Sequence, residues 1–242
     1  MEHAESLCRC SLDPLKSLQQ FEFVAKTSRF QYGDPIALSS HVVPVKDRPA
    51  YWLGAVAVIW LCLGAVGLAM LWQYDNAPGE AANAPGAWPS GSRLIRATDT
   101  PTLVMLAHPQ CTCSYASLGE LEELLARTDA HPRTYVVFLK PAAFGEGWEK
   151  TDLWRAATRL PNVSVVRDDD GVEARSFGAA TSGQTMLYDR AGRLQFSGGI
   201  TGSRAHRGDN AGRQSLLTLL NGGENARADT NVFGCPLFAS GS

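Results

Sequence analysis

Two cysteines separated by one residue are the part of this sequence best suited to chemistry. Cys111 and Cys113 lie in the segment HPQCTCS, residues 108–114. The segment follows a short apolar run typical of a buried strand, 102–107, and precedes a helical pattern, 114–127. Free backbone N–H groups and the helix dipole stabilise a thiolate at the start of a helix. Because the thiolate is the nucleophile of disulfide exchange, this placement of Cys111 predicts thiol–disulfide chemistry.

The other four of the six cysteines lie in three different settings. Cys235 lies in a Gly-Cys-Pro segment near the C-terminus, where a structural bridge and a functional thiol are both open interpretations. Cys62 lies within a long apolar stretch and is expected to behave as a small apolar residue. The remaining two, Cys8 and Cys10, lie in the N-terminal leader.

One apolar stretch is long enough to cross a membrane. Residues 51–72 include no charged side chain, and a helix of 22 residues spans about 33 Å, against about 30 Å for a bilayer core. Aromatic residues at both ends suit the two membrane interfaces. A cleaved signal peptide has a shorter apolar core that begins close to the N-terminus, so an uncleaved anchor is predicted.

The charges on either side of this span predict its orientation. Lys46 and Arg48 precede it, whereas the first charged residues after it are acidic. Cytoplasmic flanks are enriched in Lys and Arg, so the N-terminus is predicted inside and residues 73–242 outside, on the extracytoplasmic (periplasmic) side. Disulfides form and persist there, whereas Cys8 and Cys10 would face the reducing side.

The composition divides the chain into four predicted parts. These are a leader at 1–50, a transmembrane helix at 51–72, an Ala/Pro/Gly-rich linker at 73–92 and a domain at 93–242. The leader has mixed charge and no sustained period, which predicts poor order. An alternative is that the natural start lies further in, at Val43 or Val45, so that residues 1–42 do not belong to the natural protein.

Strand and helix patterns alternate within the domain. Strands are predicted at 102–107, 134–139, 163–166, 184–188 and 193–197, and helices at 114–127, 148–160, 171–177 and 210–220. The last two strands flank a turn at 190–192 and form a hairpin. Strands separated by helices, followed by a hairpin and a helix, predict an α/β fold with a mixed sheet covered on both faces.

Three segments of the sequence resemble the thioredoxin-like superfamily, and more narrowly its membrane-anchored RedB-type proteins. They are HPQCTCS, FGAATSGQTMLYDRAGRLQFSGGITGS and FGCPL, within residues 88–237. The resemblance implies a thioredoxin-like mixed sheet flanked by helices, with an extra strand and helix inserted. It also implies a thiol–disulfide or related redox role.

Two features depart from the thioredoxin pattern. Thioredoxins use C-x-x-C, whereas this chain has C-x-C, with Ser114 at the usual position of the resolving cysteine. The resolving thiol is then Cys113, through a strained ring, or Cys235, unless Cys111 acts alone on mixed disulfides. The cis-proline that normally precedes the hairpin strand would lie near Gly183, where there is no proline. Its absence puts the usual pairing with the substrate backbone in doubt.

The leading hypothesis is a membrane-anchored, extracytoplasmic thiol–disulfide oxidoreductase. Cys111 would exchange disulfides with a protein thiol or disulfide partner, and Cys113 or Cys235 would release the mixed disulfide. A formal net charge of −2 without a basic stripe argues against nucleic-acid binding. The sequence has no G-x-G-x-x-G after a strand, so no nucleotide cofactor is predicted and electrons would come from a protein partner.

Two other classes of function remain open at this point. The cysteines, together with His108 and His206, offer soft ligands that suit Cu(I). A redox-inactive accessory domain is the third hypothesis, favoured by the missing proline and by Ser114 in place of a cysteine. His108 either tunes the thiolate as a nearby cation or only ends the strand, and His206 lies in a polar loop where such residues are usually solvated.

Overall fold

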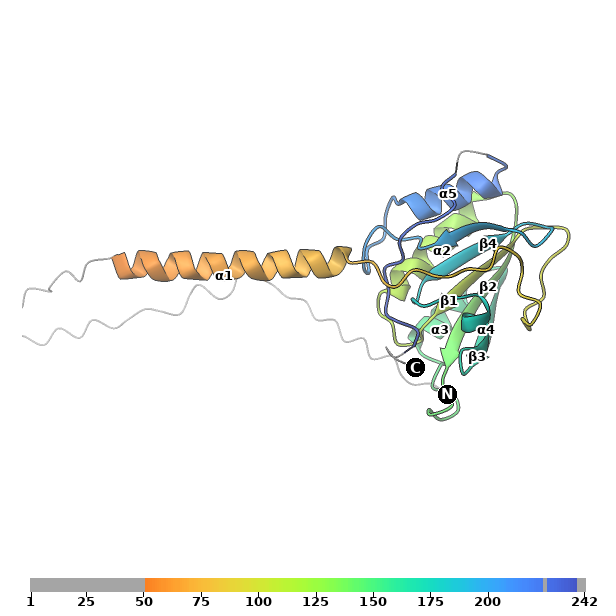
Figure 1. Ribbon diagram of the computed structural model, residues 1–242, viewed down its shortest axis with the longest axis horizontal. Helices are drawn as coiled ribbons and strands as arrows, with labels where there is room; N and C mark the ends of the chain where they lie inside the picture. Colours follow the sequence, from red (N-terminus) through yellow and green to blue (C-terminus); the bar gives the residue numbers. More distant parts are fainter. Residues whose placement is uncertain (1–50, 224–225, 239–242) are drawn as a thin grey trace, which may run out of the picture. The chain divides into compact units, whose positions relative to one another are not determined.

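The structure is a computed structural model that describes residues 51–223 and 226–238, and the predicted leader lies outside this range (Figure 1). Its elements are α1 (Tyr51–Asn76), β1 (Thr102–Ala107), α2 (Ser114–Arg127), β2 (Arg133–Lys140), α3 (Asp152–Ala157), β3 (Val163–Asp169), α4 (Val172–Ser176), β4 (Gln184–Tyr188), β5 (Leu194–Gly198) and α5 (Ala211–Leu220). Each predicted strand and helix of the domain is present. The largest difference is α3, which is shorter than the predicted 148–160, because a loop with its own turns occupies residues 141–151.

Five strands form one mixed sheet in the order β3-β2-β1-β4-β5. β2 lies parallel to both β1 and β3, as expected for strands joined by helical crossovers. β4 lies antiparallel to both β1 and β5, and a tight turn at residues 190–192 joins β4 to β5. The predicted fold class is therefore confirmed: a thioredoxin-like mixed sheet flanked by helices, preceded by one long apolar helix.

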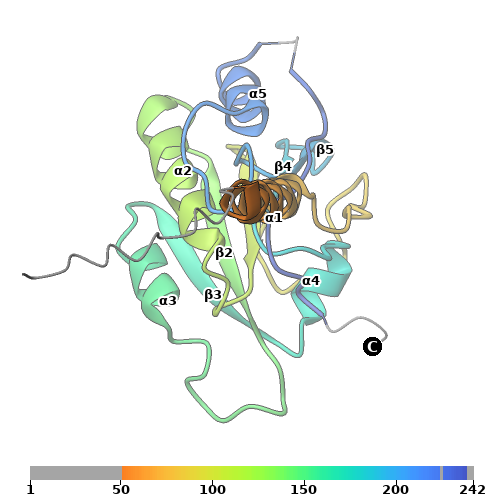
Figure 2. The same ribbon diagram turned by 90° about the vertical axis from the view of Figure 1, so that its left-hand side faces the viewer.

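The central strands are apolar on both faces, because each face has its own cover (Figure 2). In β1, Leu103 and Met105 face the first core cluster, which is formed with α2, α3 and α5. Val104 and Leu106 face the second core cluster, which is formed with α4, residues 82–94 and the C-terminal segment. Successive side chains of a strand point to opposite faces, so the sheet places the loop after β1 between these two layers.

One helix among the described residues is long and apolar enough to cross a membrane. α1 has 26 residues and a mean hydropathy of 2.3 over its most apolar window, with no buried residue. It extends to Asn76, four positions beyond the predicted end of the span. A helix that is apolar on all faces, with no residue buried in the described part of the chain, fits a membrane span and does not fit a soluble core.

Residues 77–92, assigned to the linker from their composition, lie along the domain. Gly79 donates a backbone hydrogen bond of 2.8 Å to Val232, and Asn83 donates one of 2.9 Å to Gly178. Trp88 packs edge-on against two buried aromatic rings of the second cluster, Phe177 and Tyr188. The Pro- and Gly-rich composition reflects an extended path on the protein surface, and the indole of Trp88 fixes that path.

A buried ion pair connects α2 to α5 across the first core cluster. Arg213 Nη1 lies 2.7 Å from Glu120 Oε2, and neither side chain is more than 4% exposed. Glu123 and Asp209 also contact the guanidinium, while Gly208 donates its backbone N–H to Glu120. Because charges taken out of water need partners, this network fixes the loop before α5 against α2.

We predict that Arg213→Met lowers the free energy of unfolding by about 3–5 kcal/mol, because it leaves the Glu120 carboxylate buried without a counterion. The measurement is urea unfolding of the detergent-solubilised chain. Arg155→Met is the matched control: its ion pair with Asp152 is exposed and should contribute less than about 1 kcal/mol. Equal losses in the two variants would contradict a structural role for the buried pair.

Candidate functional site

Cys111 lies in a tight turn between β1 and α2. Cys111 N donates to His108 O at 3.0 Å, and Ser114 N donates to Cys111 O at 3.1 Å. A third bond, of 3.1 Å, runs from Ala116 N to Cys113 O, and α2 begins at Ser114. These short-range bonds wind the segment directly into the helix, so the sulfur of Cys111 lies at the N-terminal end of α2.

The three cysteines predicted as site residues come together here. Cys235, 124 positions after Cys111, donates its backbone N–H to Cys111 Sγ at 3.4 Å, and its thiol also hydrogen-bonds to that sulfur. Cys113 lies close enough to interact with both other thiols. Cys62, by contrast, lies exposed on α1. The fold thus forms a cluster of three free thiols, in which Cys111 is buried and the other two are half-buried.

Hydrogen bonds stabilise the thiolate of Cys111 in spite of its burial. Burial alone raises the pKa of this thiol, but donors from Cys235 and Ser114 outweigh the burial and bring the pKa below its ordinary value. The donated groups are both side-chain and backbone groups of these two residues. Cys111 is therefore the member of the cluster that most readily becomes the nucleophile.

The other two thiols are shifted in the opposite direction. Burial and the neighbouring Cys111 raise the pKa of Cys113. The same causes raise the pKa of Cys235 to about 12. Cys111 therefore ionises before the other two thiols, whose protons can be donated to its sulfur and lost at a later step of disulfide exchange.

Ser182 lies directly before Gly183, beside the position at which the sequence analysis expected the missing proline. Its Oγ accepts from His108 N at 2.7 Å and shares a 2.7 Å hydrogen bond with Ser114 Oγ. Gly183 follows with φ +90°, a conformation that glycine adopts without strain. A Cβ atom at this position would lie 2.9 Å from the hydroxyl oxygen of Ser117 in α2. A pair of buried serines therefore connects the loop before β4 to the start of α2.

Arg204 is a site residue that the sequence analysis did not single out. It lies in the loop before α5, and its positive charge lowers the pKa of both Cys113 and Cys235, although burial prevails. Its Nη1 donates to Gly234 O at 2.6 Å, which fixes the backbone next to Cys235. No local motif marks this arginine, because only the tertiary fold brings residue 204 to residues 113 and 235.

The two histidines do not complete a metal site. His108 packs edge-on against Trp148, and burial lowers the pKa of its imidazole, so it is neutral and does not act as a cation beside Cys111. His206 lies exposed in the loop before α5. Within residues 51–223 and 226–238, no three His, Cys, Asp or Glu side chains are grouped so that they could hold a metal ion.

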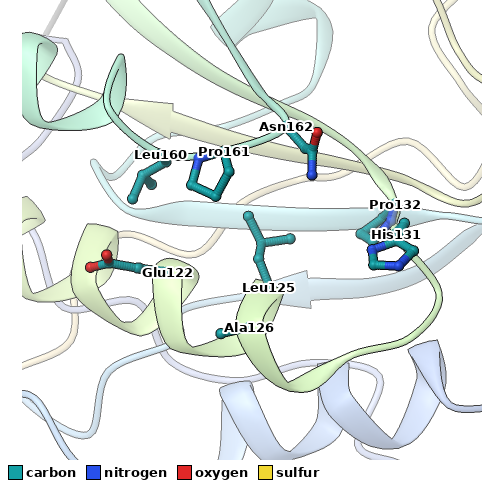
Figure 3. A pocket seen from close by; sticks show the side chains of 8 residues that line it. All are labelled: Glu122, Leu125, Ala126, His131, Pro132, Leu160, Pro161 and Asn162. Carbon is teal, nitrogen blue, oxygen red and sulfur yellow. The ribbon is translucent and has the colours of Figure 1, made fainter.

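One pocket of the domain lies away from the cysteines (Figure 3). Its volume is about 240 Å³, and its walls come from α2 and from the segments His131–Pro132 and Leu160–Asn162. These two segments precede β2 and β3, whereas Cys111 follows the end of the parallel strand β1. The pocket therefore opens at the opposite end of the parallel strands and has no part in thiol chemistry.

No protein-family model and no curated protein matches this chain. Three solved structures are similar to it at low identity. A hypothetical protein from Sinorhizobium meliloti is 19% identical over 68% of this chain and 96% of its own, with a TM-score of 0.48. An uncharacterized conserved protein from Geobacillus kaustophilus is 18% identical over 69% and 94%, with a TM-score of 0.49. The thioredoxin domain of a thiol-disulfide oxidoreductase from Bacteroides vulgatus is 16% identical over 60% and 99%, with a TM-score of 0.36.

Proposed function

We propose that this protein is a membrane-anchored, extracytoplasmic thiol–disulfide oxidoreductase. The observation that carries the proposal is the cluster of three thiols in which the pKa of Cys111 is lowered while those of Cys113 and Cys235 are raised. A structural cysteine gains nothing from a lowered pKa, whereas a nucleophile requires it. The resemblance of the segments HPQCTCS and FGCPL to RedB-type proteins supports the same role.

Exchange begins with the Cys111 thiolate. It attacks one sulfur of a partner disulfide, so that a Cys111–partner bond forms, the partner's S–S bond breaks, and a partner thiolate leaves and takes up a proton. A second thiol of the site then loses its proton and attacks Cys111, which forms an internal disulfide and releases the partner as a dithiol. The partner has gained two electrons, and a dithiol protein must reduce the internal disulfide. In reverse, the same steps oxidise a partner.

Cys235 is the better placed of the two resolving candidates. Both its thiol and its backbone N–H contact Cys111 Sγ, and the hydrogen bond from its thiol is the largest contribution that lowers the pKa of Cys111. Cys113 adopts a helical conformation, φ −62° and ψ −29°, at the start of α2. A bridge from Cys111 to Cys113 would have to bend this turn, whereas a bridge to Cys235 joins two residues already in contact.

The anchor and its orientation support an oxidising compartment for the site. The helix α1 precedes the domain, and the cations Lys46 and Arg48 precede α1, which favours a cytoplasmic N-terminus. The domain would then lie on the periplasmic side, where protein partners carry disulfides.

We predict a reversible disulfide between Cys111 and Cys235. In a glutathione redox buffer, followed by mass spectrometry of the quenched protein, wild type and Cys113→Ser should both form it. Cys235→Ser should abolish it, because the thiol in contact with Cys111 is gone. A bridge to Cys113 in the wild type would keep the proposed activity but change the resolving thiol. A Cys111 that stays reduced in every buffer would overturn the activity.

The lowered pKa of Cys111 predicts a distinctive pH profile. Because its thiolate persists below the ordinary pKa of a thiol, the first step in the thiolate ultraviolet absorbance of the reduced protein should lie at lower pH than in a free cysteine. Cys111→Ser should remove that step. Ser114→Ala should move it to higher pH, since a donor to the thiolate is lost. An unchanged first step in Cys111→Ser would assign the low-pKa thiol elsewhere.

The predicted orientation can be read from cysteine accessibility. Ser90 is exposed on the domain side of α1, so a Ser90→Cys variant in intact cells should react with a membrane-impermeant maleimide. Cys8 and Cys10 precede α1 and provide the control, because they should react only after permeabilisation. The reverse pattern would contradict the orientation. A mature chain that begins after α1 would identify α1 as a cleaved signal sequence.

A further inference from the structure

The buried state of Cys111 is at odds with its proposed reaction. Its side chain is 1% exposed, so no protein disulfide can approach the sulfur along the line of attack in this conformation. The group that lies directly on the sulfur is the backbone and thiol of Cys235. Access to Cys111 therefore depends on whether the segment that carries Cys235 can move.

That segment pairs with the loop before β4 through backbone hydrogen bonds. Ser182 N donates to Cys235 O at 2.8 Å, and Leu237 N donates to Ala180 O at 2.8 Å. Thr181 and Pro236 face each other as an antiparallel bridge. Residues 234–237 thus satisfy the backbone groups of residues 180–182 in the way that an extended peptide does when it binds to an exposed edge.

The segment is fitted to this edge at close range. A Cβ atom placed on Gly234 would lie 1.9 Å from the carbonyl oxygen of Ser182, so only glycine allows the observed approach. Leu237 is buried in the second core cluster, and Arg204 fixes the carbonyl of Gly234. Pro236, between these contacts, is exposed. The hold on residues 234–237 consists of two backbone–backbone bonds, the bonds with Arg204 and Cys111 Sγ, and one buried side chain. A short segment held by so few contacts can open locally without unfolding the domain.

We propose that residues 234–237 are a displaceable internal substrate that covers Cys111. In the reduced protein this segment pairs with the backbone of residues 180–182. A partner reaches Cys111 only when the partner's own extended, cysteine-bearing segment displaces residues 234–237 and pairs with residues 180–182 instead. Return of the segment then brings Cys235 back to Cys111 to resolve the mixed disulfide. This inference rests on the proposed function, and it restricts the partners to proteins whose disulfide lies in an extended, exposed segment.

The test measures attack by Cys111 on a peptide that copies residues 232–238, its cysteine activated as a mixed disulfide with thionitrobenzoate. Attack by the Cys111 thiolate breaks that S–S bond, forms a Cys111–peptide disulfide and releases coloured thionitrobenzoate. The detergent-solubilised full chain is used in a background with serine at Cys8, Cys10, Cys62 and Cys113. The rate of the same background with Cys111→Ser is subtracted. N-acetylcysteine, activated in the same way, is the probe that lacks a backbone to pair.

The decisive variant is Gly234→Ala, which forces the segment away from Ser182. We expect the peptide to react with Cys111 about tenfold faster than in the wild type, the change that a shift of about 1.4 kcal/mol in the opening equilibrium produces. Gly91→Ala is the matched control, because a Cβ atom there meets no other atom within 4 Å. In Gly234→Ala, the peptide should also react faster than activated N-acetylcysteine.

A second pair of variants keeps the inference testable if Gly234→Ala does not fold. Leu237→Ala removes the buried anchor of the segment and should accelerate the peptide reaction, whereas Leu220→Ala, a buried leucine of α5, should not. Equal rates in wild type, Gly234→Ala and Leu237→Ala would overturn the cover, as would equal rates for the two probes in Gly234→Ala. If Cys111 reacts with neither probe in any variant, the proposed function itself fails.

Discussion

The burial of the Cys111 sulfur, whose pKa is nevertheless lowered, is the constraint on which this site depends. Removing a thiolate from water is costly, and only hydrogen-bond donors aimed at the sulfur can compensate for it. In this protein the donors come from Ser114, at the start of α2, and from Cys235, in the C-terminal segment. The end of α2 alone is therefore insufficient, and the site is complete only when a segment distant in sequence lies on Cys111.

The sheet explains how segments so distant in sequence meet. β1 is the central strand of the order β3-β2-β1-β4-β5, so the loop that follows it emerges between the two covering layers. The loop before β4 lies beside it because β4 pairs with β1, and Gly183 N donates to Leu106 O at 2.8 Å. The segment with Cys235 then adds to the loop before β4. The buried strand β1 thus positions the loop before β4, and that loop positions the segment with Cys235.

The sequence was sufficient to predict the strands and helices and the position of Cys111 between β1 and α2. Strict apolar runs such as 102–107, and the helical stripe at 114–127, reflect local packing requirements that are readable along the chain. The contributions of Ser182 and Arg204 could not be predicted in this way, because each depends on contacts across 30 or more positions. The path of residues 77–92 along the domain could not be predicted either, since a Pro- and Gly-rich composition is compatible with both a free linker and an extended segment bound to the surface.

The two departures from the thioredoxin pattern are connected in space. Ser114 stands where the second cysteine of C-x-x-C is expected, Ser182 lies beside the position of the missing proline, and their hydroxyl groups bond to each other at 2.7 Å. A serine pair there leaves the α2 position unable to resolve a mixed disulfide, but it still supports the thiolate through Ser114. The thiol that remains in contact with Cys111 is on the C-terminal segment, which pairs with the backbone of Ser182. Through Ser182, the serine at the helix position and the C-terminal segment that carries Cys235 are therefore parts of one arrangement around Cys111.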